Sequence, residues 1–248
     1  HKPYTIPDDS RGFEAIDRDE EELIENGFRS LPEYNSFRLL DHSLGQFMQM
    51  ASEEEYFDRT LFVLLGDNGT PGKMPNLPKA EEAHGIGTFH TPLAIYGPGL
   101  IREGKVYDFL ATQMDVLPTI AGLAGWSLPN TTMGRNLFDP RFNGKHYALV
   151  LQARGVVASI GLVGADHYLQ VDSDGNGARL HSYRSETPME DVGESFPEKL
   201  EEMTELALGF YHTSKYLMYN NSPRLYSPEA PSDDASAAGS VTVVSRDD

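Results

Sequence analysis

Asp67 and Asn68 are the residues of this sequence whose types and position best suit chemistry. They follow an unbroken apolar run, residues 61–65, and the single residue Gly66. A carboxylate beside a carboxamide supplies hard oxygen ligands, which suit Ca²⁺, Mg²⁺ or Mn²⁺ better than zinc. Asp-Asn-Gly is also typical of an ordinary turn after a strand. On these residues alone, a metal site and a simple turn are equally good interpretations.

The apolar run indicates how the pair would be held. A short apolar run closed by a turn signal suits a strand that is buried on both faces, as in a parallel sheet covered by helices. In open α/β sheets, ligands bind just beyond the carboxyl ends of such strands. We therefore expect Asp67 and Asn68 to lie at the edge of the sheet where chemistry is usually done.

A second apolar run, residues 93–96, predicts another buried strand, and His90 lies just before it. The intervening residues 69–88 are rich in Gly, Pro, Lys and Glu and show no regular period. Loops of this length in a compact domain are usually functional or mobile. His90 therefore lies at the end of a loop of this kind, and His84 lies within it.

Further along the chain, the pattern predicts helices and a second sheet. Apolar residues at spacings of three and four indicate amphipathic helices over 34–51 and 197–219. Residues 112–125 are typical of a capped helix, with Asp115 as N-cap, and we interpret Asp115 as structural. Short β-like runs separated by Gly or Asp turns predict a small antiparallel sheet, at residues 147–151, 156–162, 167–171 and 178–183.

The composition limits the possible partners. The chain has 248 residues and a formal net charge of -18. This charge argues against nucleic acid and against electrostatic docking to anionic lipid, because both need a basic surface. There is no cysteine, which excludes disulfides and Cys-ligated zinc. The chain opens on His1 rather than Met, in what we interpret as a loop, so we expect a C-terminal fragment of a longer protein.

Four short motifs follow one another along the chain: His-x-Pro-Tyr-Thr-x-Pro (1–7), Thr-Leu-Phe-Val-Leu-Leu-Gly-Asp-Asn-Gly (60–69), His-Thr-Pro-Leu-Ala-Ile-Tyr-Gly-Pro-Gly (90–99) and Gln-Met-Asp-Val-Leu-Pro-Thr (113–119). Together they resemble the sulfatase family of the alkaline phosphatase superfamily. The resemblance has features of the branch that contains lipoteichoic acid synthase and the phosphoglycerol transferases. Each motif alone is weak, but four in the right order favour the metal interpretation of Asp67 and Asn68.

The resemblance implies an α/β fold with a mainly parallel sheet flanked by helices, as in alkaline phosphatase, and a small C-terminal antiparallel sheet plus helix. Residues 1–145 would be the C-terminal part of the sulfatase-like domain. Residues 146–221 would form the C-terminal subdomain, and residues 222–248 a flexible tail.

The resemblance also assigns roles to individual residues. Asp67 and Asn68 match a late metal-ligand pair, which usually serves calcium in sulfatases. The synthase branch has His at the second position and uses manganese or magnesium, so Asn68 departs from that pattern. His1 matches a histidine that contacts the sulfate or phosphate group. His90 would contact the substrate or bind the metal, and His84 is a weaker candidate on the same loop. An ordinary loop histidine is the alternative for each.

The family nucleophile lies in the N-terminal half of the domain, before the position of His1. It is a Cys or Ser converted to formylglycine in sulfatases, or a Thr in the transferases. This chain has no Cys, and none of its Ser or Thr residues stands in the matching context. We therefore expect the fragment alone to be inactive and to need the N-terminal half of the same protein.

The function implied for the whole protein is a metal-dependent hydrolase or transferase of sulfate or phosphate esters. Its substrate would be an anionic ester, either sulfated or containing phosphoglycerol. The alternatives are a phosphoglycerol transferase of the lipoteichoic acid synthase type and a non-catalytic pseudoenzyme or binding module. We expect the protein on the periplasmic or extracellular face, with a membrane-anchored parent as one of the alternatives.

Overall fold

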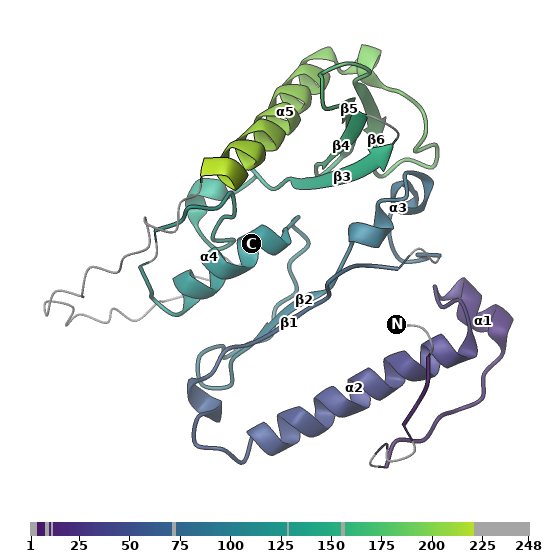
Figure 1. The fold of residues 1–248 in the computed structure, drawn as a ribbon, viewed down its shortest axis with the longest axis vertical. Helices are drawn as coiled ribbons and strands as arrows, with labels where there is room; N and C mark the ends of the chain where they lie inside the picture. Colours follow the sequence, from purple (N-terminus) through teal and green to yellow (C-terminus); the bar gives the residue numbers. More distant parts are fainter. Residues whose placement is uncertain are drawn as a thin grey trace, which may run out of the picture. The chain divides into compact units, whose positions relative to one another are not determined.

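The computed structural model describes residues 4–7, 10, 12–70, 73–127, 129–154 and 157–220. The chain divides into two compact units (Figure 1). The first unit comprises His1–Tyr107 together with Ser182–Glu190, and the second comprises Asp108–His181 together with Asp191–Asp248. The first unit is therefore built from two separate stretches of the sequence. His1 and the tail 222–248 lie outside the described residues, and the boundaries predicted at 145 and 221 stay predictions.

The first unit begins with two helices, α1 (Glu20–Glu25) and α2 (Leu31–Ala51). Ser30 is the N-cap of α2. Its hydroxyl accepts a hydrogen bond from the Glu33 amide at 3.4 Å and so caps the first turn. The helix predicted over 34–51 is thereby confirmed. Its apolar stripe is exposed in the described structure, at Phe37 (60%), Leu40 (63%) and Phe47 (47%).

The two predicted apolar strands are present as β1 (Phe62–Leu65) and β2 (Leu93–Tyr96). They pair with each other in antiparallel fashion, with Phe62 opposite Tyr96 and Leu65 opposite Leu93. The two strands are therefore not parallel to each other, and the described residues do not show the mainly parallel sheet that was expected. Neither strand is buried on both faces, because Leu65 and Tyr96 are exposed. Among the described residues, each strand has one partner only, which leaves its other edge unpaired.

The segment between these strands contains more structure than its sequence suggests. It forms a short helix, α3 (Lys79–Ala83), and a turn of 3₁₀ helix, η2 (Gly87–Phe89). A similar turn, η1 (Phe57–Arg59), precedes β1. The interpretation of residues 69–88 as a loop without regular structure is therefore wrong in part, because a helix of one turn leaves no periodic signal to recognise.

The second unit starts with α4 (Gln113–Leu123), followed by a turn of 3₁₀ helix, η3 (Pro140–Phe142). A four-stranded sheet with strand order β3-β4-β5-β6 comes next. Its strands are β3 (Ala148–Arg154), β4 (Val157–Val163), β5 (His167–Asp172) and β6 (Arg179–Ser182). β3 with β4, and β4 with β5, pair in antiparallel fashion, which confirms the predicted small sheet.

A long helix, α5 (Pro197–Asn220), covers this sheet after a short 3₁₀ turn, η4 (Gly193–Ser195), and packs on β4 and β5 (Figure 1). The core between them contains Ile160, Leu162, Leu169, Met203 and Ala207, each at most 1% exposed. The apolar face predicted for residues 197–219 is the face that packs. No helix in the described part of the chain is both long and apolar enough to cross a membrane.

Candidate functional site

Asp67 and Asn68 lie in an exposed turn directly after β1 and Gly66. The Asn68 amide donates to Asp67 Oδ1 at 3.0 Å, and Asn68 Nδ2 donates to the Gly69 carbonyl oxygen at 2.9 Å. The side-chain nitrogen of Asn68 is thus used within the turn, and its carbonyl oxygen is the atom it can offer to a cation. The turn therefore presents two adjacent side chains that carry oxygen donors to solvent.

Gly69 holds this turn against the residues that precede β2. Its amide donates to the Thr88 carbonyl oxygen at 2.8 Å. A methyl group in place of its hydrogen would lie 2.2 Å from the Gly87 carbonyl oxygen and 2.5 Å from that of His90. Only glycine fits this close approach of two backbones. The approach brings the Asp67–Asn68 turn next to His90, which is more than twenty positions away in the sequence.

His90 ends η2 and is half-exposed, with 46% of its side chain accessible. Its Nδ1 atom lies 3.2 Å from Oε1 of Glu81 on α3. The hydrogen bond with Glu81 raises the pKa of His90 above its usual value, against the opposing effect of partial burial. His90 is therefore an accessible imidazole whose protonated form is favoured by a neighbouring carboxylate.

The Glu81 side chain is 4% exposed and also accepts a hydrogen bond from the hydroxyl of Tyr183. Burial, and then the hydrogen bond to Glu81, raise the pKa of Tyr183. Neither Glu81 nor Tyr183 is distinguished by its sequence context. Glu81 stands in a charged stretch that is typical of a solvated surface, and Tyr183 lies 102 positions away in a different predicted element. No local pattern in the sequence could have paired them.

His84 has a structural position. It is buried, and its Nε2 atom lies 2.9 Å from the Pro188 carbonyl oxygen. Together with the pair of Glu81 and Tyr183 and an exposed ion pair between Lys79 and Glu186, it attaches segment 182–190 to α3. The structure thus gives His84 a packing role that separates it from exposed His90.

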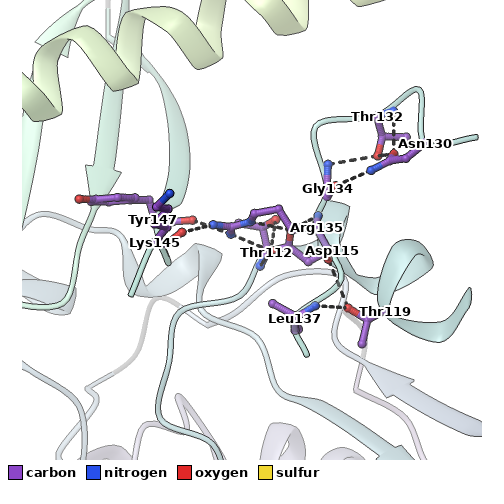
Figure 2. A network of polar contacts seen from close by, with 10 residues as sticks. All are labelled: Thr112, Asp115, Thr119, Asn130, Thr132, Gly134, Arg135, Leu137, Lys145 and Tyr147. Atoms are coloured by element: carbon purple, nitrogen blue, oxygen red, sulfur yellow. Dashed lines mark hydrogen bonds and ion pairs between the residues drawn. The ribbon is translucent and has the colours of Figure 1, made fainter. Parts of the chain in front are cut away.

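Asp115 lies in a separate, structural network in the second unit. Figure 2 shows its carboxylate between the start of α4 and Arg135. Oδ2 accepts from the Thr112 amide at 2.9 Å and from Arg135 Nη2 at 3.1 Å, and Oδ1 accepts from the Arg135 amide at 2.7 Å. Thr112 is the N-cap and Asp115 the third helical residue, so the prediction of Asp115 as N-cap is wrong by three positions. The interpretation of Asp115 as structural agrees with its 1% exposure.

Arg135 extends this network to the sheet of the same unit. Its guanidinium donates to the Tyr147 carbonyl oxygen at 3.3 Å and to the Lys145 carbonyl oxygen (Figure 2). On the other side of Asp115, the Thr119 hydroxyl accepts from the Leu137 amide at 3.0 Å. The buried ion pair of Asp115 and Arg135 thus connects α4, the loop that follows it and the residues that lead into β3.

The structure describes three of the four predicted site residues, Asp67, Asn68 and His90. The backbone of the turn that carries Asp67 and Asn68 approaches the backbone of His90 through Gly69, while His1 lies outside the described residues. Among the residues that the structure describes, no three His, Cys, Asp or Glu side chains lie together as a metal site would require. Asp67 and Asn68 suit a hard cation in kind, but two ligands are fewer than the six to eight that calcium takes.

Comparison with known proteins gives this arrangement a context. Residues 1–126 match the family model described as Sulfatase. The chain is 29% identical over 109 residues to an arylsulfatase of Clostridium perfringens. It is 30% identical over 106 residues to arylsulfatase A of Homo sapiens. These matches cover 43% and 40% of this chain, but only 22% and 21% of the two relatives.

Solved structures share the fold. The crystal structure of Ps i-CgsB superimposes with a TM-score of 0.59 at 19% identity and covers 91% of this chain. BT1596, described as a 2-O GAG sulfatase, gives a TM-score of 0.52 at 17% identity and covers 79% of this chain. The matches cover 53% and 44% of those two chains, respectively. The chain thus spans about half the length of the structures that it resembles.

Proposed function

The chain belongs to the sulfatase family, and from this premise we propose that it is the C-terminal part of a metal-dependent enzyme that hydrolyses anionic esters, sulfate esters first. The observation that carries the proposal is the turn of Asp67 and Asn68, held by Gly69 against the backbone of His90. This contact places the backbone of a turn with two exposed, oxygen-bearing side chains against the backbone of a residue with an exposed imidazole. Such a set can bind a cation and move a proton beside it.

Asp67 and Asn68 would hold the divalent cation. Both offer oxygen and neither offers sulfur or imidazole nitrogen, which favours calcium, with manganese or magnesium as alternatives. Asn68, rather than His, at the second position also favours a sulfatase over a phosphoglycerol transferase. The remaining ligands would come from outside the described residues.

A bound cation would neutralise the non-bridging oxygens of the ester and stabilise the charge that develops there. This is needed here because the chain carries a net charge of -18 and would otherwise repel an anionic substrate. His90 would donate a proton to the leaving oxygen, and its raised pKa supports that role. His1 would contact the sulfate group, a role that rests on the resemblance of its motif alone.

We propose that the nucleophile and the other cation ligands lie in an N-terminal half of the same protein. Two features of the first unit support a missing partner. The stripe of Phe37, Leu40 and Phe47 on α2 exposes an apolar surface of the kind that proteins usually cover. The outer edges of β1 and β2 also offer backbone groups to further strands, which would complete a mainly parallel sheet.

The substrate class and the location of the whole protein are part of the same proposal. Its substrate would be a sulfated molecule, or an ester that contains phosphoglycerol. We place the protein on the periplasmic or extracellular face of the cell, with a membrane anchor outside this chain as a possible addition.

The test is made on the protein in its full natural length. Calcium binding is measured by calorimetry, and turnover is measured with p-nitrophenyl sulfate, p-nitrophenyl phosphate and phosphatidylglycerol. Asp67→Ala should abolish cation binding and lower turnover at least about a hundredfold, because Lewis-acid stabilisation contributes several kcal/mol. Asp58→Ala, at another exposed aspartate of the same unit, should change neither.

The substrates separate the alternatives. Faster turnover of the sulfate ester supports the sulfatase, whereas release of diacylglycerol from phosphatidylglycerol alone would indicate a phosphoglycerol transferase. Cation binding without turnover of any of the three would indicate a non-catalytic binding module. Unchanged cation affinity in Asp67→Ala would remove the metal assignment.

A further inference from the structure

Glu81 is the centre of a buried polar cluster that connects three parts of the first unit. Its side chain is 4% exposed and comes from α3. His90 approaches its Oε1 atom from the end of η2, and the hydroxyl of Tyr183 donates to the same atom from segment 182–190. The phenol and the imidazole thus meet at a single oxygen atom of the Glu81 carboxylate.

The contact also determines which nitrogen of His90 carries the hydrogen. A carboxylate can only accept, so Nδ1 of His90 donates at 3.2 Å. Nε2 is then the ring nitrogen that can take up or release a proton. Carboxylates that hold a histidine in one tautomer and orientation are a recurrent feature of active sites and metal sites.

We propose that Glu81 is a positioning residue for His90, that Tyr183 holds Glu81 in place, and that the pair keeps Nε2 of His90 ready to protonate the leaving oxygen of the ester. This rests on the proposed function. In the step, an oxygen nucleophile, either a hydroxyl or water, forms a bond to the sulfur or phosphorus atom and releases its own proton to solvent water. The bond to the leaving oxygen breaks, its electron pair stays on that oxygen, and the proton comes from Nε2. His90 ends neutral, with Nδ1–H still bonded to Glu81.

The charges around His90 agree with this assignment. Glu81 from α3 is the charged group that contacts the ring, and its hydrogen bond is the main cause of the raised pKa of His90. Tyr183 stays a neutral donor because burial and Glu81 raise its pKa. Arg184, next to Tyr183 on the same segment, acts in the opposite direction on that phenol. The net effect favours an imidazolium beside the carboxylate.

The experiment reads His90 directly, by NMR titration of the full-length protein with ¹⁵N-labelled histidine, assigned with His90→Ala. In the native protein we expect the Nδ1–H tautomer and a pKa above 6.5. Glu81→Gln should weaken proton binding by His90 at least about tenfold, because a neutral amide no longer favours the charged ring. Glu82→Gln, at the exposed neighbouring glutamate on α3, is the matched control and should leave the titration unchanged.

Tyr183→Phe distinguishes the effect of the Glu81 charge on His90 from an effect of altered packing of segment 182–190. It keeps the Glu81 carboxylate but removes the hydroxyl that holds it, so the pKa of His90 should stay raised, with a fall smaller than that in Glu81→Gln. An unchanged pKa of His90 in Glu81→Gln would overturn the positioning role. An equal loss in Tyr183→Phe and Glu81→Gln would overturn it as well, because the effect would then reflect packing.

Turnover distinguishes this inference from the proposed function. In Glu81→Gln the alkaline limb of the pH profile of kcat should move to lower pH, in step with the titration of His90. If the NMR result is as expected but His90→Ala keeps full turnover, the catalytic role of His90 in the proposed function is wrong. If turnover depends on His90 but the pKa of His90 is unchanged in Glu81→Gln, only the positioning role of Glu81 is wrong.

Discussion

The buried carboxylate of Glu81 accepts a hydrogen bond from the phenol of Tyr183, which lies 102 positions further along the chain. The bond, together with the contact between His84 and Pro188, attaches segment 182–190 to α3. The same carboxylate contacts His90, whose backbone lies against Gly69 of the turn that follows Asp67 and Asn68. The carboxylate that joins segment 182–190 to α3 is therefore also the group that contacts the candidate site residue His90.

Removal of the Tyr183 hydroxyl should destabilise the protein. In Tyr183→Phe the buried carboxylate of Glu81 loses a donor, which should cost about 1–3 kcal/mol of unfolding free energy. Tyr216→Phe is the control, because Tyr216 is 65% exposed and its loss should change stability by less than about 0.5 kcal/mol. Urea denaturation followed by circular dichroism measures both. Equal midpoints for the two variants would contradict the role of Tyr183.

Removal of the negative charge at Asp115 should be far more costly than the same change at an exposed site. Asp115→Asn leaves Arg135, whose side chain is 13% exposed, without its counter-charge, and should cost about 3–5 kcal/mol. Asp139→Asn breaks the ion pair with Arg141, whose side chain is 81% exposed, and should cost less than about 1 kcal/mol. Thermal denaturation compares the two variants. A smaller loss at Asp115 than at Asp139 would show that the network of Figure 2 is dispensable.

A methyl group at Gly69 should disturb the candidate site. Gly69→Ala would place that group 2.2 Å from the Gly87 carbonyl oxygen, so the turn must move away from His90. We expect a loss of about 1–3 kcal/mol in stability and at least about tenfold weaker calcium binding by the full-length protein. Gly45→Ala, within α2 and with no atom within 4 Å of the new methyl group, should instead stabilise by about 0.5–1 kcal/mol. Unchanged calcium affinity in Gly69→Ala would separate the turn from the cation.

The protein should lose stability in acid partly through Glu33. Its hydrogen bond with Arg29 lowers the pKa of Glu33 from 4.5 to about 2. Between these values the unfolded chain binds more protons than the native chain, so this contribution is complete above pH 4.5 and is lost as the pH falls toward 2. It is about 1 kcal/mol or less, because the Arg29 side chain is 49% exposed.

Glu33→Gln should therefore flatten the dependence of unfolding free energy on pH between 4.5 and 2. Denaturant titrations at several pH values measure this slope. Glu14→Gln, at an exposed position of the same unit, should keep the slope of the native protein. A slope that is the same in both variants would show that the pair of Arg29 and Glu33 does not contribute.

Local patterns in the sequence predicted the elements well where burial follows a simple period. β2 is found at the predicted residues 93–96, and α5 buries the face expected from its apolar spacing. The position of the Asp67–Asn68 turn after a strand was also predictable, because a glycine closes the apolar run. In each case, neighbouring residues carry the whole signal.

Features that depend on distant residues were not predictable in this way. Apolar content suggested two buried parallel strands, but strand composition does not specify the partner, and β1 pairs with β2 in antiparallel fashion. Thr112 rather than Asp115 caps α4, and the two residues form a local capping box, so only the contact of Asp115 with Arg135, which lies 20 positions away, depends on a distant residue. The role of Glu81 depends on Tyr183 and leaves no trace in its own surroundings.

The discontinuous first unit has a consequence for biosynthesis. Ser182–Glu190 belongs to this unit, although the sheet strands β3 to β5 are translated before it. When Glu81 and His84 emerge from the ribosome, their partners Tyr183 and Pro188 have not yet been synthesised. The amino-terminal unit can close only after the carboxy-terminal sheet has largely been synthesised, so a premature stop codon after β5 would damage the unit that was translated first.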